Sequence, residues 1–303
     1  MPAKKKANNA AGANAAAAVH LPERLRDPAV FLAELAALCT NVEGLAVVIA
    51  GARHHCADPR VQAAVLVALK KLISGVGDSV KVNGKTADSN IGTLFELGAL
   101  EAALAAMSAH AAERAVQAAA CGMLASLGDD DSPRAKAIRA KFAELGAVAR
   151  IMGVLDAFPR DRELVAAAVH VLGLVSTGTA GTAQIIALGG IERVLMAMDN
   201  HPDGGRGVCN RAVFFLNITS LSSPEATQRL VALGAAARVR GAMAAPDAYA
   251  LTTKFGQELH DRLPAVDFAT YIFTQCVSLY IYIYVYVYAC VCIYMYVYMH
   301  IYI

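Results

Sequence analysis

Apolar residues along most of this chain return at the three- and four-residue spacing of an amphipathic helix. The first such stripe follows Pro28 and contains Phe31, Leu32, Leu35 and Leu38. Ordered structure is therefore predicted to begin near residue 28, with a helix whose apolar side faces a core.

Two further helices are predicted directly after the first. Asn41 is a capping residue placed before a stripe that begins at Leu45. Asp58 and Pro59 supply a second cap and a proline at the first helical position, and the stripe after them begins at Val61. Three consecutive helices of this kind form one unit of a helical array.

A short cassette then shows that the unit repeats. It reads Ala187-Leu188-Gly189-Gly190-Ile191-Glu192-Arg193-Val194-Leu195, and related copies begin at Glu96, Glu144 and Ala232. The copies lie 43 to 48 residues apart, a period typical of helical repeat proteins. The glycine of each copy, such as Gly98, is expected to end a short first helix in the left-handed conformation, with the next helix leaving at a steep angle.

The pattern divides the chain into three parts. Residues 1–27 are basic and alanine-rich and are predicted to be disordered, and residues 28–263 form the array, with an insertion at 75–90. The last helix of the array is expected between Asp247 and Leu263, on a stripe that contains Leu251, Phe255 and Leu259. Residues 264–303 form a tail of different composition.

Two phrases resemble the armadillo repeat family. They are Gln184-Ile185-Ile186-Ala187-Leu188-Gly189-Gly190-Ile191 and Phe215-Leu216-Asn217-Ile218. The resemblance covers about residues 28–263 and implies an all-α fold, a right-handed superhelix of about four to five repeats. In this family neighbouring units share one core, and the third helices line a concave groove that receives extended peptides or partner proteins.

The resemblance also implies groove positions that can be compared with the importin-alpha type. Those proteins carry a Trp and, four residues later, an Asn on each third helix, and the amide holds a peptide backbone. The corresponding pairs here are Val67 and Lys71, Gly122 and Ser126, His170 and Leu174, and Val213 and Asn217. Only Asn217 matches, so the prediction is a general protein-binding groove. Asn217 is expected either to contact a partner backbone or to cap a local carbonyl.

Composition favours a binding protein over an enzyme. The net charge is +2, and beyond Lys4-Lys5-Lys6, a nuclear-import signal or a solvated tail, no basic cluster indicates nucleic acid. Seven cysteines form no CxxC pair, which argues against a zinc site or disulfide framework and for a cytoplasmic or nuclear protein. His54-His55-Cys56 is read as a polar turn and Gly178–Thr182 as an inter-repeat loop without the lysine of a phosphate loop. No catalytic set, metal or cofactor is predicted.

The tail alternates strictly from Tyr280 to Ile303. Every even position is Tyr, Cys or His, and every odd position is Ile, Val, Ala or Met. The codons of these two groups interleave in a TA/TG simple-sequence repeat, so the preferred interpretation is a translated repeat. The alternatives are a membrane anchor, which would place tyrosine hydroxyls in the hydrocarbon core, or an aggregation-prone β segment.

The predicted function is therefore a non-enzymatic scaffold or adaptor for a protein or extended peptide. The alternatives are an importin-like nuclear transport adaptor and, where the tail is a real anchor, a membrane-tethered scaffold.

Overall fold

The computed structural model describes residues 19–74, 87–128, 132–202, 207–246 and 248–263. The chain divides into two compact parts, residues 1–261 and 262–303, and the helices described below belong to the first, apart from Arg262 at the end of the last helix. Within the described residues every regular element is a helix and no strand occurs. The predicted all-α class is confirmed.

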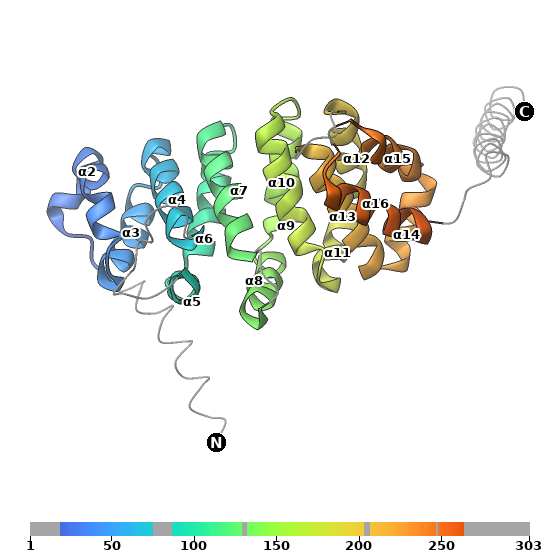
Figure 1. Cartoon of the computed structure of the whole chain (residues 1–303). Coiled ribbons are helices and arrows are strands. Elements are labelled where there is room, and N and C mark those ends of the chain that lie inside the picture. Colours follow the sequence, from blue (N-terminus) through green and yellow to red (C-terminus); the bar gives the residue numbers. More distant parts are fainter. Residues whose placement is uncertain (1–18, 75–86, 129–131, 203–206, 247, 264–303) are drawn as a thin grey trace, which may run out of the picture. The chain divides into compact units, whose positions relative to one another are not determined.

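The helices follow one another in groups of three, called triplets here (Figure 1). A short 3-10 helix, η1 (Glu23–Arg26), precedes the first triplet. The five triplets are α2 (Pro28–Leu38), α3 (Val42–His54) and α4 (Pro59–Ser74); α5 (Ala87–Glu96), α6 (Ala99–Ala109) and α7 (Arg114–Gly128); α8 (Pro133–Glu144), α9 (Ala147–Ala157) and α10 (Arg162–Val175); α11 (Thr179–Ala187), α12 (Gly190–Asn200) and α13 (Val208–Ser222); α14 (Pro224–Ala232), α15 (Ala235–Ala244) and α16 (Ala250–Arg262).

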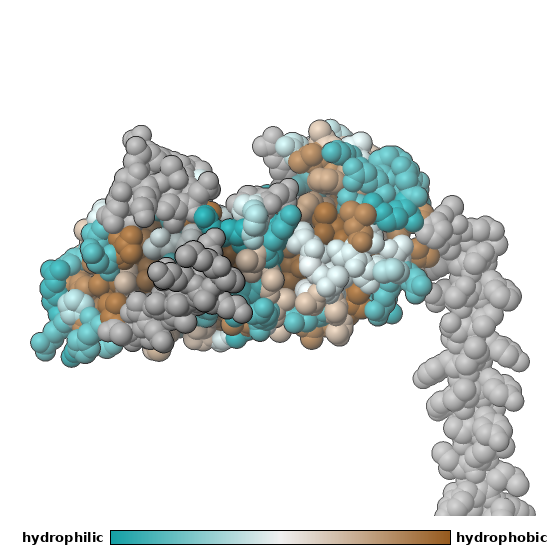
Figure 2. Space-filling view, turned by 90° about the horizontal axis from the view of Figure 1, so that it is seen from below, coloured by the Kyte–Doolittle hydropathy of each residue, from teal (hydrophilic) through white to brown (hydrophobic). Residues whose placement is uncertain are grey.

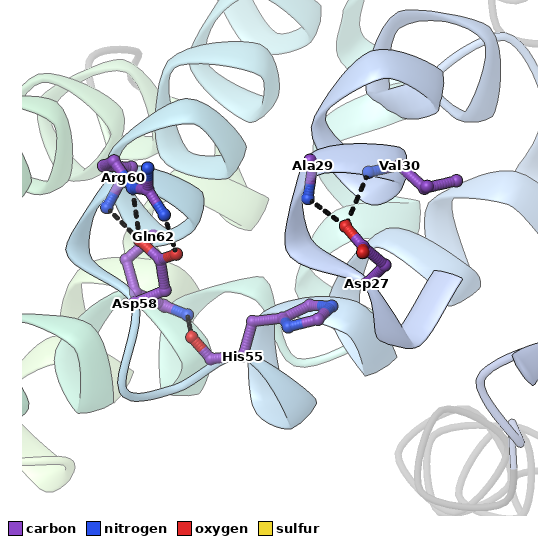
Figure 3. Close-up of polar contacts among 7 residues, drawn as sticks. All are labelled: Asp27, Ala29, Val30, His55, Asp58, Arg60 and Gln62. Carbon is purple, nitrogen blue, oxygen red and sulfur yellow. Dashed lines mark hydrogen bonds and ion pairs between the residues drawn. The ribbon is translucent and has the colours of Figure 1, made fainter. Parts of the chain in front are cut away.

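Polar side chains begin several of these helices as the sequence predicts. Asn41 accepts from the Gly44 N–H at 2.7 Å, and Asp58 accepts from the Arg60 N–H at 2.9 Å. Asp27 caps α2 in the same way, on the N–H groups of Ala29 and Val30 (Figure 3). Each cap satisfies donors that have no partner inside the helix, which fixes where the helix starts.

A left-handed glycine separates the first and second helices of four triplets. Gly98, Gly146, Gly189 and Gly234 have φ values of 83°, 72°, 68° and 66°. Side chains rarely adopt this conformation, so glycine is the residue that lets the short first helix end and the next begin at a new angle. The expectation for Gly98 is confirmed.

The third helices pack on one another from triplet to triplet. Helix α4 contacts α7, α7 contacts α10, and α10 contacts α13. Small residues allow the close approach: a Cβ at Gly173 of α10 would lie 2.8 Å from the Phe214 ring of α13. Val65, Leu69, Leu124 and Leu172 of these helices are buried, so neighbouring triplets share apolar surface that each would otherwise expose.

A recurring arginine joins three of the second helices to the triplet before them. Arg193 of α12 donates to the Leu188 carbonyl at 2.6 Å and pairs with Asp156 of α9 at 2.7 and 3.0 Å. Arg238 of α15 makes the same contacts with Leu233 and Asp199.

Arg150 of α9 repeats the arrangement with a neutral partner, the Ser108 hydroxyl of α6, at 2.7 Å. All three arginines stand four residues after a left-handed glycine, so the same side chain closes the first helix of its own triplet and reaches the preceding one.

A histidine makes a second link between triplets. Nε2 of His110, just after α6, donates to the Cys56 carbonyl at 2.8 Å, and Nε2 of His201, just after α12, donates to the Pro159 carbonyl at 3.0 Å. His55, after α3, donates to Leu25 at 2.9 Å. Its own carbonyl accepts from the Gln62 amide at 2.9 Å (Figure 3).

Two boundaries and the buried side of one helix differ from the predictions. Order starts before residue 28, because Leu21 and Leu25 are buried and the Leu25 carbonyl holds His55; residues 1–18 lie outside the described residues. Helix α5 starts at Ala87, inside the predicted insertion, whose remaining residues 75–86 are not described. Helix α16 buries Leu259 but leaves Leu251 43% exposed. Its buried side contains Thr252 and Gly256 instead, and neither residue belongs to the apolar stripe from which the helix was predicted.

Replacing Gly234 by alanine isolates the cost of the left-handed turn. A Cβ at this position meets no atom within 4 Å, so only the backbone conformation opposes it. We expect Gly234→Ala to lower the free energy of unfolding by about 1–2 kcal/mol. Gly241→Ala in α15 is the matched control, since its Cβ is equally unobstructed and the helix interior favours alanine by about 0.5–1 kcal/mol. Urea unfolding measures both, and two changes of the same sign would contradict the assignment.

The arginine link is tested by a double-mutant cycle on Arg193 and Asp156. We expect Arg193→Met to destabilise the protein by about 1 kcal/mol, because it loses the carbonyl contact as well as the ion pair. The coupling with Asp156→Asn should be about 0.5 kcal/mol, the size of a partly exposed pair. Arg240→Met removes an exposed arginine that has no partner among the described residues and should change stability by less than about 0.5 kcal/mol. A coupling near zero would show that the contact does not join the triplets.

Candidate functional site

A hollow crosses the third helices of four successive triplets. Its volume is about 410 Å³, and its walls come from α4, α7, α10 and α13. The residues that line it are Lys70, Gly122, Ala125, Ser126, Glu163, Ala166, Ala167, His170 and Arg211. It therefore lies where the family resemblance implies a groove.

The floor of the hollow is made of small residues. Gly122 and Ala125 belong to α7, and Ala166 and Ala167 belong to α10; all four are half-buried. None of these four floor residues carries a side chain longer than a methyl group. An extended chain can thus lie close to the helices, whereas larger residues on the floor would hold it away.

Two cations stand on the rim. Lys70 comes from α4 and Arg211 from α13, and neither side chain makes a hydrogen bond or ion pair with another residue among those that the structure describes. The Lys70 amine lies 3.0 Å from the position that a Cβ on Gly122 would occupy. This lysine therefore extends over α7 beside the floor.

The acidic groups on the same rim are already engaged. Arg114 of α7 pairs with Asp161 and, at 3.4 Å, with Glu163. The side-chain hydrogen bond from Arg114 lowers the pKa of Asp161, and the Leu164 N–H that Asp161 caps lowers it further. Both acidic groups thus face a cation of their own chain.

Aromatic rings extend the surface away from the hollow. His170 of α10 lies edge-on to Phe214 of α13, with ring centroids 6.4 Å apart. Phe214 in turn meets Phe255 of α16 at 5.6 Å. The third-helix surface therefore changes from small residues over α7 and α10 to aromatic residues over α13 and α16.

The predicted groove residues fall into three sets. Gly122, Ser126 and His170 line the hollow, and Ser126 donates to the Gly122 carbonyl of its own helix at 3.0 Å. On α4, Val67 is 42% exposed and Lys71 is exposed. The remaining three, Leu174, Val213 and Asn217, are buried.

Asn217 is covered by α16. Its amide donates to the Glu258 carboxylate at 3.0 Å, and only 1% of the residue is exposed. Two further contacts join α13 to α16. One turn before Asn217, Phe214 packs against Phe255, and two turns before it, Asn210 donates to the Thr252 hydroxyl at 2.7 Å. A partner backbone would reach Asn217 only by displacing Glu258. Asn217-Ile218-Thr219 also matches a glycosylation motif, but Asn217 and Thr219 are both buried inside this packed helix.

Sequence reasoning missed Lys70, Glu163 and Arg211. They do not occupy the aligned Trp and Asn positions, and their convergence depends on how four helices are spaced. One signal was present: Ala125, Ala166 and Ala167 give α7 and α10 a small-residue side that is not needed for the apolar stripe.

The other candidate features do not form a site. No group of three or more metal-capable side chains occurs within the described ranges. His54, His55 and Cys56 form a turn in which His55 is buried and Cys56 is exposed. Gly178 precedes α11, and Thr182 of that helix is buried and donates to the Ser176 carbonyl at 2.9 Å. The acidic run Asp129–Asp131, which the sequence predicts to be a solvated loop, lies outside the described residues.

Exposed apolar side chains are scattered rather than gathered. The large ones among the described residues are Val30, Val67, Leu188, Met196, Leu221 and Leu251. They come from five different helices and the turn after α11, and Figure 2 shows apolar patches separated by polar ones on the face it presents. The hollow is accordingly a better defined candidate site than any apolar patch.

The membrane criteria give a limited result. Among the described helices no single one is long and apolar enough to span a bilayer, and one bent pair, Asn90–Glu96 with Ala99–Ala109, meets the length and composition requirements together. The alternating tail lies outside the described residues.

A scan against protein-family models, a search of curated proteins and a search of solved structures each find no match to this chain. The functional site is therefore defined by its geometry and charge.

Cysteine reactivity should follow burial. Desolvation raises the pKa of Cys39 to about 11 and that of Cys121 to about 12, so few thiolates form at pH 8. Cys56 is exposed. We expect iodoacetamide to alkylate Cys56 at least about a hundredfold faster than Cys121. Peptide mass mapping measures the rates site by site, and urea should equalise them; equal rates in the folded protein would mean that α7 is not packed as described.

Proposed function

We propose that this chain is a non-enzymatic protein-binding scaffold of the armadillo type, which holds a protein segment or extended peptide along its third helices. The observation that carries the proposal is the hollow across α4, α7, α10 and α13. A surface built from equivalent helices of successive triplets offers repeated, similar contacts to a chain that crosses them.

The chemistry of the hollow supports a peptide ligand. The floor of Gly122, Ala125, Ala166 and Ala167 leaves room for a backbone, while longer side chains stand at the edges. Small-molecule pockets are mostly concave and lined by apolar and aromatic groups that bury most of the ligand. This hollow runs across helices and is bordered by charged residues, which suits a chain that enters at one side and leaves at the other.

The importin-like alternative has less support. It needs repeated asparagines on the third helices, and the single match, Asn217, is engaged with Glu258. The membrane-tethered alternative depends on residues 264–303, which are outside the described residues. A cytoplasmic or nuclear location remains part of the proposal.

The proposal is tested by blocking the floor. Random peptides selected on the full chain should include binders that are lost on Ala166→Phe, because the ring fills the hollow. Ala36→Phe is the control: Ala36 is exposed on α2, away from the hollow, and the same ring there should leave binding unchanged. Fluorescence polarisation measures affinity, and circular dichroism checks that both variants keep their helix content. Selected peptides that bind both variants equally would place binding elsewhere.

A further inference from the structure

We infer that the segment bound in the hollow is acidic, with carboxylates received by Lys70 and Arg211. This inference rests on the proposed function and adds the chemical class of the ligand. It starts from a contrast between these two cations and the other basic residues that join the triplets.

Arginines at the junctions between triplets are paired within the chain. Arg193 pairs with Asp156, Arg238 with Asp199, and Arg114 with Asp161 and Glu163. Lys70 and Arg211 also lie at junctions, but no described residue neutralises them. The fold thus closes these structural ion pairs and leaves two positive charges on the rim of the hollow that crosses the third helices.

Arg211 gains more from a bound anion than Lys70 does. It is half-buried, so part of its hydration is lost without a compensating partner. A guanidinium presents its donors in a planar fork that matches a carboxylate in two-point contact. A ligand carboxylate at this position would supply what the free protein lacks.

Lys70 complements Arg211 from the other side of the floor. Because Gly122 has no side chain, the lysine can lie over α7 with its amine close to the glycine. A peptide crossing the alanines of α7 and α10 would have one cation at each side. Two spaced positive charges suit several acidic residues in an extended chain better than one isolated anion.

The remaining ionisable groups around the hollow do not reverse this preference. Glu163 shares Arg114 with Asp161, and His170 faces the Phe214 ring. A basic peptide would meet Lys70 and Arg211 as like charges, which opposes binding.

The test uses the full chain and short fluorescent peptides with blocked ends. The probe alternates Ala and Glu, and its counterparts alternate Ala with Gln and Ala with Lys. We expect the Glu peptide to bind, the other two to bind at least about tenfold more weakly, and added NaCl to weaken the Glu peptide most, because charged contacts are screened.

The variant Lys70→Gln/Arg211→Gln should weaken the Glu peptide by about tenfold or more. Its matched control is Lys136→Gln/Arg240→Gln, which removes the same two charge types from exposed positions on α8 and α15 that have no partner within the described part of the chain. The control should retain the affinity within about twofold, so a loss from net charge alone is recognised.

Three results would overturn the inference: no binding of the Glu peptide, equal losses in the test and control variants, or Gln and Glu peptides bound alike. The last result, combined with loss of both peptides on Ala166→Phe, would leave the proposed groove function standing and remove only its acidic specificity. If peptides selected from a random library bind the Ala166→Phe variant as well as the unchanged chain, the proposed groove function itself is wrong.

Discussion

The left-handed turn at each inter-helix glycine is the constraint on which the arrangement of the triplets depends. Gly98, Gly146, Gly189 and Gly234 end the first helix and set the direction of the second. An arginine four residues after three of these glycines can then close the first helix and reach the preceding triplet at once. The turn therefore controls a contact inside one triplet and a contact between two, so one backbone conformation has two consequences.

The third helices gain their regular spacing from these junctions. Once the second helices are held to their predecessors, α4, α7, α10 and α13 pack side by side, and small residues decide how closely. Gly173 admits the Phe214 ring, whereas the alanines of α7 and α10 face the hollow and fill little of it. The same helices thus pack with one side and line the hollow with the other: large apolar residues lie in the core, and short ones lie at the hollow.

Features encoded within a few residues were predictable from the sequence, and features encoded by several helices were not. Asn41, Asp58 and Gly98 act on their own backbone, so their roles followed from local chemistry. The burial of Leu25 depends on His55, thirty residues away, and the cover over Asn217 depends on Glu258. The hollow likewise requires Lys70 and Arg211 to meet from helices α4 and α13. Alignment to an importin-type pattern selected Gly122, Ser126 and His170, which line the hollow, but passed over the charges beside them.

Charge pairing separates the structural surface of this protein from the surface that we propose binds a partner. Along the second helices, each cation that would otherwise lie between triplets has an anion or carbonyl of the chain, as at Arg193 and Arg238. On the third helices the pairing of Arg114 with Asp161 continues this rule up to the edge of the hollow. At the hollow itself, the side chains of Lys70 and Arg211 have no such partner among the described residues. A half-buried cation costs free energy when it has no partner, and a scaffold can tolerate that cost where the partner comes from another molecule. The same logic explains why Asn217, although it matches a familiar groove residue, is a weaker site: its hydrogen bond is already satisfied by α16.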